Sequence, residues 1–334
     1  MARPRAFRSW AAWLGLPPHG APYDPQSRWV TSYVLPPAWL AGVRLLLGLY
    51  AFVSIIINYS FNGWEQFAYF TVLSYWGVVA WFVASGLHTA AYALALRRWK
   101  QQAAGPAKAS AAAVPRSWLA QRFPRPLQFL HSLLFSTICT FPLLVLVVYW
   151  AVLAGSAFAS VRSTWQNLTV HALNYVFVFL DFAVLGRGPM MPWSHMLFCV
   201  IILALYLGVA YIHYANVGIY VYDFLDPGEV GGQGPLAGVA IGIGVGTCIA
   251  FLAGQACLWL REVLAAKLQR SGAWGSAKPV GVPDEALLPT DVGPGPDGEG
   301  SPRPVAGAAP DAAPSAHDAA WTPPHVPVSA STSA

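Results

Sequence analysis

The chain has 334 residues, of which 56% are hydrophobic and only 10% are charged. A soluble domain carries about 25% charged residues, so this composition excludes an ordinary soluble protein and is typical of a protein that crosses a membrane several times. The net charge of +5 does not indicate a nucleic-acid partner, because the Lys and Arg residues lie in loops that flank long apolar runs, where they set membrane topology.

The chain contains six apolar runs, each long enough to cross a membrane as a helix, since about 20 residues span the hydrocarbon core. A basic, proline-interrupted lead, residues 1–37, comes before the first run. Residues 38–262 are predicted to form an all-α, six-span transmembrane helix bundle. The Pro-, Ala- and Gly-rich residues 263–334 predict a disordered tail. The six predicted spans cover residues 39–57, 67–94, 127–153, 168–185, 193–214 and 236–260.

Basic residues alternate between the two sides of the predicted bundle. The lead contains four arginines, the loop after the second span contains seven Lys and Arg residues, and Arg187 follows the fourth span. The loops after the first, third and fifth spans contain only Arg162 between them. Because positively charged loops resist translocation, this alternation predicts that both termini are cytoplasmic.

Polar residues from three separate spans are predicted at one depth, close to the far, non-cytoplasmic side of the membrane. Thr71 and His171 lie four and three residues after the starts of spans that enter from that side. At a rise of about 1.5 Å per residue, both are roughly 5 Å inside. The fifth span runs the other way, so His213 near its end reaches the same layer. Asp223 and Asp226 follow in the next loop, just outside the membrane.

A hydroxyl, an imidazole and carboxylates in one layer are the groups that nucleophilic acyl transfer needs. A hydroxyl is a poor nucleophile until a neighbouring base takes its proton, and histidine suits this role because its unperturbed pKa lies close to physiological pH. Thr71 is the candidate nucleophile and His171 the candidate base. Ser74, one turn further along the same helix face, is a second candidate nucleophile. Asn174 is placed to orient the imidazole or to pack between helices.

Two other interpretations of this layer remain open. Ser and Thr residues in membrane helices usually hydrogen-bond their own backbone, and His213 fits an aromatic belt at the interface. An open metal site built from His171, His213 and Asp223 would favour metal-dependent hydrolysis instead. No Cys or His spacing matches a closed metal site, and the four cysteines lie inside apolar runs. We therefore expect no metal, no cofactor and no disulfide framework.

A second polar layer is predicted toward the cytoplasmic side. Arg44 lies near the start of the first span, where its side chain is expected to reach the lipid headgroups. Asp181 and Arg187, at the end of the fourth span and in the turn after it, are expected to form an ion pair. Three histidines of this layer are expected to be interfacial anchors: His88, His131 and His195. Three glycines at a spacing of four in the sixth span predict a stripe for close helix contact: Gly238, Gly242 and Gly246.

Three short stretches, in order and spacing, resemble the androgen-induced membrane protein family, which includes the androgen-dependent TFPI-regulating protein. Residues 69–74 resemble its phenylalanine–threonine–x–x–serine stretch in the second span, and residues 171–174 resemble its second hallmark. Residues 211–225 are similar to the aromatic segment that comes last in the family pattern. The resemblance covers about residues 43–260.

The androgen-induced branch of that family is known as six-span threonine hydrolases that cleave fatty-acid esters of hydroxy fatty acids. The resemblance implies that Thr71 is the nucleophile and His171 its base, and that the substrate is a lipid ester in the endoplasmic reticulum or plasma membrane. Tyr75 stands where many relatives have asparagine. Residues 74–77 and 171–181 are also similar to the rolling-stone proteins of myoblast fusion. That second resemblance implies the same fold with a non-enzymatic role in adhesion, fusion or signalling.

Overall fold

The computed structural model describes residues 10–18, 21–103 and 115–271. Six helical segments in this part of the chain are long and apolar enough to cross a membrane. The prediction of an all-α, multi-pass membrane protein is therefore confirmed. The membrane-spanning segments are Pro37–Asn62, Phe70–Gln102, Arg125–Leu153, Val161–Leu185, Ser194–Val217 and Gln233–Leu268.

Five of the spans are built on single long helices, and the fourth is built from several short ones. The long helices are α2 (Pro37–Asn62), α3 (Phe70–Ala103), α5 (Arg125–Val148), α8 (Ser194–Val217) and α9 (Gln233–Arg270). The fourth span consists of α6 (Val161–Leu168), the π-helical turn η5 (Thr169–Leu173), α7 (Asn174–Phe179) and the π-helical turn η6 (Leu180–Leu185). A third π-helical turn, η3 (Tyr149–Leu153), continues α5. The remaining short elements are α1 (Trp10–Trp13), η1 (Arg28–Val30), η2 (Trp64–Ala68), α4 (Trp118–Gln121), η4 (Ala154–Ser156) and η7 (Asp223–Leu225).

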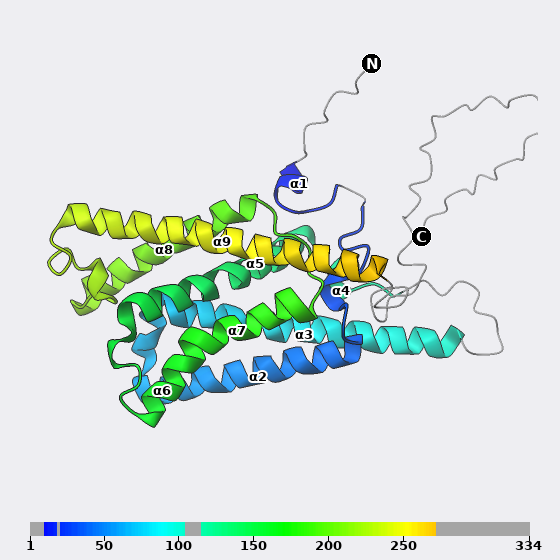
Figure 1. The fold of residues 1–334 in the computed structure, drawn as a ribbon, viewed down its shortest axis with the longest axis horizontal. Helices are drawn as coiled ribbons and strands as arrows, with labels where there is room; N and C mark the ends of the chain where they lie inside the picture. The colour runs from blue at the N-terminus through cyan, green and yellow to red at the C-terminus, as the bar shows by residue number, and fades with distance from the viewer. Residues whose placement is uncertain (1–9, 19–20, 104–114, 272–334) are drawn as a thin grey trace, which may run out of the picture. The chain divides into compact units, whose positions relative to one another are not determined.

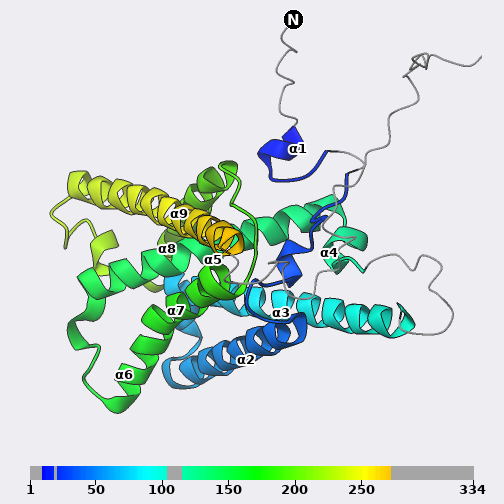
Figure 2. The same ribbon diagram turned by 45° about the vertical axis from the view of Figure 1, so that its right-hand side comes forward.

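Helix α5 lies at the centre of the bundle, where it packs against α3, α7, α8 and α9. Helices α2 and α3 form a hairpin on one side of α5, and α8 and α9 run together on the other side (Figure 1, Figure 2). Helix α9 continues to Arg270, so residues 263–270, which the sequence placed in the tail, belong to this helix. The rest of the predicted tail, from residue 272, lies outside the described residues.

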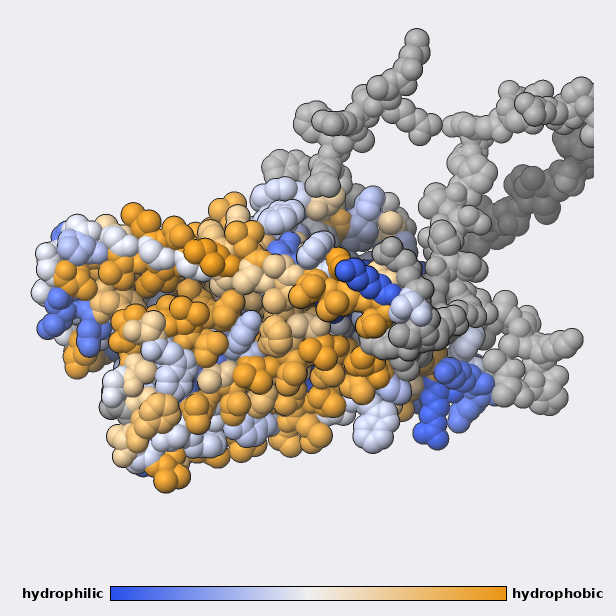
Figure 3. All heavy atoms as spheres, viewed as in Figure 1, coloured by the Kyte–Doolittle hydropathy of each residue, from blue (hydrophilic) through white to orange (hydrophobic). Residues whose placement is uncertain are grey.

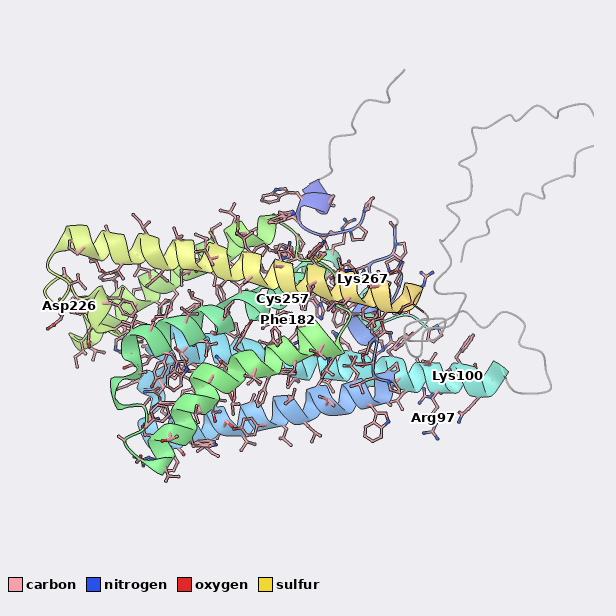
Figure 4. The ribbon with its side chains drawn as sticks, viewed as in Figure 1. Arg97, Lys100, Phe182, Asp226, Cys257 and Lys267 are labelled. Carbon is pink, nitrogen blue, oxygen red and sulfur yellow. The ribbon has the colours of Figure 1, made fainter. Side chains whose placement is uncertain are left out.

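The side of the bundle is apolar and its two ends are charged. Figure 3 shows hydrophobic side chains over the helices of the visible face, as expected for contact with lipid. Charged residues lie at opposite ends in Figure 4, with Asp226 in the connection between α8 and α9 and three basic residues near the far ends of α3 and α9. We call these the acidic end and the basic end. The basic residues are Arg97, Lys100 and Lys267.

A buried ion pair joins α2 to the fourth span near the basic end. Arg44 is 2% exposed, and its guanidinium donates to both carboxylate oxygens of Asp181, at 2.7 and 3.3 Å. Its other terminal nitrogen donates to the carbonyl of Trp29 at 2.8 Å and to Thr89 Oγ1 at 2.9 Å. Trp81 Nε1 donates to Asp181 at 2.8 Å. Charges removed from water need such hydrogen bonds, because an unpaired buried charge costs several kcal/mol.

This pair corrects two expectations from the sequence. The side chain of Arg44 does not reach toward headgroups, and Asp181 pairs with Arg44 instead of Arg187. Arg187 donates to Thr31 Oγ1 at 3.0 Å and lies over the ring of Tyr33, 4.9 Å from its centroid. Closeness in sequence favoured the local pair, whereas in the fold the partner of Asp181 comes from a neighbouring helix.

The three histidines expected as interfacial anchors are buried instead. The exposed fractions of His88, His131 and His195 are 7%, 8% and 0%. The imidazole of His131 lies edge-on to the ring of Trp29, with 4.8 Å between centroids, and His195 Nδ1 is 2.8 Å from Ser136 Oγ. These side chains are therefore part of the protein interior.

The described part of the lead folds onto the basic end of the bundle. Trp29 is 4% exposed and belongs to the main hydrophobic core. Just before it, the Asp24 carboxylate accepts the backbone N–H groups of Arg28 and Trp29 at 2.6 and 3.2 Å. Partial burial raises the pKa of this carboxyl to about 7, although both N–H donors favour the ionised form. The Arg28 side chain pairs with Glu262 of α9 at 2.8 Å, which ties the lead to the last span.

The glycines of α9 do not form the expected contact stripe. Among the described residues, a Cβ at Gly238 or Gly242 would meet no neighbouring element within 4 Å, and one at Gly246 would meet only Leu144, at 3.4 Å. The close approach lies further along the helix, at Gly254, where a Cβ would be 3.1 Å from the carbonyl oxygen of Cys139 in α5.

Candidate active site

Thr71 is the second residue of α3, and two tyrosines from elsewhere in the chain fix the start of this helix. The backbone N–H of Phe70 donates to Tyr222 Oη at 3.1 Å, and Tyr206 Oη donates to the carbonyl of Ala68 at 2.9 Å. The first N–H groups of a helix have no partner within it, so such contacts hold its first turn in place. Thr71 is 8% exposed, and its side chain interacts with the phenol of Tyr222. The sequence placed Thr71 four residues after the start of its span. In the structure, η2 occupies residues 64–68 and α3 starts only at Phe70, so Thr71 lies in the first turn of α3.

His171 and Tyr149 both lie in π-helical turns, His171 within η5 and Tyr149 at the start of η3. Such turns are rare and occur frequently at functional sites. The imidazole of His171 stacks on the ring of Tyr149, with 3.4 Å between centroids and 5° between the planes. Nδ1 of His171 is buried and has no hydrogen-bond partner in the described part of the chain. The stack fixes the orientation of an imidazole that keeps one ring nitrogen unused.

Thr71 and His171 line the same cavity, which has a volume of about 390 Å³ and lies at the acidic end. Tyr149 lines it too, as do Tyr222 and Asp223 from the connection between α8 and α9. We call it the polar cavity, because much of its remaining wall consists of side-chain amides. The amide residues are Asn58, Asn62, Gln66, Gln166 and Asn167.

A second cavity, of about 380 Å³, lies between α5, α8, α9 and the start of α3. We call it the apolar cavity, because its wall is almost entirely hydrophobic. Both volumes lie in the range of small-molecule sites, about 300–1,000 Å³. The two cavities share four lining residues, so the hydroxyl-bearing side chain of Thr71 lies at their boundary. The shared residues are Thr71, Tyr149, Leu153 and Tyr222.

Of the supporting residues named from the sequence, Asp223 lines the polar cavity and is exposed. Ser74 is 8% exposed and lines neither cavity, and its Oγ has no hydrogen-bond partner among the described residues. Asn174 is fully buried, and its side-chain oxygen accepts the backbone N–H of the next residue at 2.6 Å, not a bond from His171. His213 is half-buried in α8 and lines neither cavity.

Sequence reasoning missed Tyr149 and the amide wall. Nothing in the sequence around Tyr149 marks it as the neighbour of a histidine from the next span. A signal for the amides was present, because Asn58 and Asn167 lie at the edges of apolar runs. In the fold, Asn58 Oδ1 accepts from Asn62 Nδ2 at 2.6 Å and from Gln166 Nε2 at 3.5 Å. The ends of α2 and α6 are thus joined by polar side chains.

Across residues 10–18, 21–103 and 115–271, no three His, Cys, Asp or Glu side chains come close enough to hold a metal ion. His171, His213 and Asp223 therefore do not form the metal site considered from the sequence. Comparison of the chain with protein-family models, with curated proteins and with solved structures found no match. The fold and the site define the class of protein: a multi-pass helical membrane protein in which a polar and an apolar cavity meet at Thr71.

Proposed function

We propose that this protein is an integral-membrane lipid ester hydrolase in which Thr71 is the nucleophile and His171 its base. One observation carries the proposal: Thr71 lies where the apolar cavity meets the polar cavity that His171 also lines. A lipid ester has the same division, since an apolar acyl chain is joined through a carbonyl group to an oxygen-bearing alcohol. An acyl chain in the apolar cavity brings the ester carbonyl to Thr71.

The reaction has two steps. Thr71 Oγ1 attacks the carbonyl carbon, and its proton passes to His171 directly or through one water. The bond to the alcohol oxygen then breaks, the alcohol takes the proton from His171, and the acyl group stays on Thr71. Water deprotonated by His171 next attacks this acyl group, the bond to Thr71 Oγ1 breaks, and Oγ1 takes the proton back from His171 as the fatty acid leaves. No hydrogen bond joins Thr71 to His171 in the described structure, and catalytic hydrogen bonds often tighten only when substrate binds.

Tyr222 supplies a hydrogen-bond donor beside the nucleophile. Its phenol interacts with the Thr71 side chain and lines both cavities. Burial raises the pKa of this phenol, so it stays protonated at physiological pH. A donor held next to the reacting carbonyl stabilises the negative charge that develops on its oxygen. We assign Tyr222 this role.

The orientation proposed for the bundle places both termini in the cytoplasm and the polar cavity at the opposite side, in the endoplasmic reticulum or plasma membrane. Its support is the charge distribution, since Arg97, Lys100 and Lys267 gather at one end. Lys and Arg near membrane spans favour the cytoplasmic side. The hydrolysis as written uses no metal and no cofactor.

Membranes that contain the wild type, Thr71→Ala or His171→Ala test the proposal, with fatty-acyl esters as substrates and a fluorophosphonate ester as a covalent probe. We expect wild-type hydrolysis and labelling, and a loss of about 100-fold or more in either variant. Ser74→Ala and His213→Ala are matched controls, because these side chains line neither cavity. Full activity in Thr71→Ala or His171→Ala would sink the proposal. An expressed wild type that neither hydrolyses esters nor takes the label would favour adhesion, fusion or signalling.

A further inference from the structure

The wall of the polar cavity offers both hydrogen-bond donors and acceptors. A side-chain amide has two N–H donors and one carbonyl acceptor. Some of these are used within the protein, as in the bonds from Asn62 and Gln166 to Asn58, and in the bond from Asn167 to the carbonyl of Ala157 at 3.2 Å. Others are free, because Gln66 lines the cavity with no side-chain hydrogen bond among the described residues. A hydroxyl group also donates and accepts, so several hydroxyl groups fit this wall.

The charge on the wall opposes an anionic ligand. Asp223 lines the polar cavity, and the described residues place no Lys or Arg side chain in its wall. Arg162 of α6 does not line the cavity, and it lies over the ring of Phe61, 5.0 Å from the ring centroid. A phosphate or carboxylate would meet the Asp223 carboxylate without a cation to offset the repulsion, and such like-charge contact selects against a ligand.

An apolar ligand is also disfavoured here. A long alkyl group in the polar cavity would separate the amides from water without replacing their hydrogen bonds, which is costly. The adjoining apolar cavity already offers a better place for a hydrocarbon chain. The two cavities are therefore suited to different parts of one substrate, the apolar cavity to a hydrocarbon chain and the polar cavity to groups that form hydrogen bonds.

We infer that the alcohol portion of the substrate is neutral and carries several hydroxyl groups, as in a monoacylglycerol, and that it binds in the polar cavity. This inference rests on the proposed hydrolase function and narrows its substrate class. The acyl chain occupies the apolar cavity, the ester carbonyl lies at Thr71, and the hydroxyl groups contact the amides and Asp223. Hydrolysis then yields a fatty acid and a free polyol.

The first experiment compares esters that share one acyl chain. Wild-type membranes are assayed with 1-monooleoylglycerol, with octyl oleate, with oleoyl lysophosphatidate and with the oleate ester of hydroxystearic acid. We expect kcat/KM for monooleoylglycerol to exceed that for each of the others by about 10-fold or more. Octyl oleate lacks the hydroxyl groups for which the wall is suited, and the Asp223 carboxylate repels the two anionic esters.

The second experiment substitutes residues in the wall of the polar cavity. Gln66→Leu is expected to lower kcat/KM for monooleoylglycerol about 10-fold and to raise kcat/KM for octyl oleate relative to it, because an octyl group then covers no unpaired amide at this position. Asp223→Asn is expected to raise kcat/KM for oleoyl lysophosphatidate several-fold. Asp226→Asn is the matched control, because Asp226 lies in the same connection but does not line the cavity. It should change no substrate ratio.

The outcomes separate this inference from the proposed function. If the wild type hydrolyses octyl oleate or either anionic ester as fast as monooleoylglycerol, the hydrolase stands and the inference about the alcohol is overturned. Unchanged substrate ratios in both Gln66→Leu and Asp223→Asn overturn it as well. If the wild type hydrolyses none of the four esters, the hydrolase proposal and the inference fall together.

Discussion

The imidazole of His171 lies face to face with the ring of Tyr149, 3.4 Å between centroids and 5° between planes. The two residues come from different spans, and each lies in a π-helical turn. A π-helical turn alters the direction in which its side chains point, so two local departures from α-helical geometry meet in this contact. We take the contact as the feature that positions the proposed base.

Tyr149→Leu should lower kcat about 10-fold, because His171 loses the ring that fixes its orientation. Aromatic pairs are worth about 0.5–1.5 kcal/mol beyond their buried area, and about 1.4 kcal/mol corresponds to a factor of ten in rate. Initial rates at equal expression measure the effect. Tyr149→Phe keeps the stack and should stay close to the wild-type rate. Equal losses in the two variants would assign the effect to the hydroxyl group and not to the stack.

Tyr222→Phe should reduce ester hydrolysis about 100-fold, because the proposed oxyanion donor is removed. It should also lower stability by about 1–3 kcal/mol, since the N–H of Phe70 loses its acceptor. Tyr206→Phe breaks the neighbouring bond to Ala68 and serves as a control for a disturbed start of α3. If both variants lose the same activity, the role of Tyr222 is to hold the helix and not to donate to substrate.

Asp181→Asn should destabilise the bundle by about 3–5 kcal/mol, because the guanidinium of Arg44 stays buried without its counter-charge. The double variant Arg44→Met, Asp181→Leu removes both charges at similar volume and should recover most of this loss. Thermal unfolding in detergent measures both. A double variant as unstable as Asp181→Asn would show that the hydrogen bonds around the pair, and not the unpaired charge, dominate.

Gly254→Ala should lower stability by about 1–3 kcal/mol, because the added Cβ would lie 3.1 Å from the Cys139 carbonyl oxygen of α5. Gly242→Ala, in the same helix, meets no neighbouring element and should be neutral or stabilising by up to about 1 kcal/mol. Unfolding temperatures of the two variants test the comparison. A larger loss of stability in Gly242→Ala than in Gly254→Ala would mean that α9 makes its tight contact at the glycine stripe predicted from the sequence.

The six spans could be predicted because apolar length is a property of the sequence alone. The shared depth of Thr71 and His171 followed from counting residues inward from loops on the same side, and both side chains do line one cavity. The helix ends were less accurate. The turn η2 delays the start of α3 until Phe70, and α9 continues past the predicted end of the sixth span, residue 260, to Arg270.

Contacts between spans could not be predicted, because sequence distance says little about which helices become neighbours. The sequence predicted a pair between Asp181 and Arg187, six residues away. In the fold, Asp181 of the fourth span pairs with Arg44 of α2. Tyr149 was missed for the same reason, and because no pattern in the sequence marks a π-helical turn. The amide wall combines the end of α2 with the end of α6, which only the fold brings together.

The position of Trp29 has a consequence for biosynthesis. The lead is made before α5, but the ring of Trp29 packs against His131 and Phe135 of α5, which are made about a hundred residues later. Trp29 therefore completes its packing only after the third span has been made. Its docking then supplies the backbone carbonyl that accepts from Arg44, so a segment made before the first span is fixed in place only after the third.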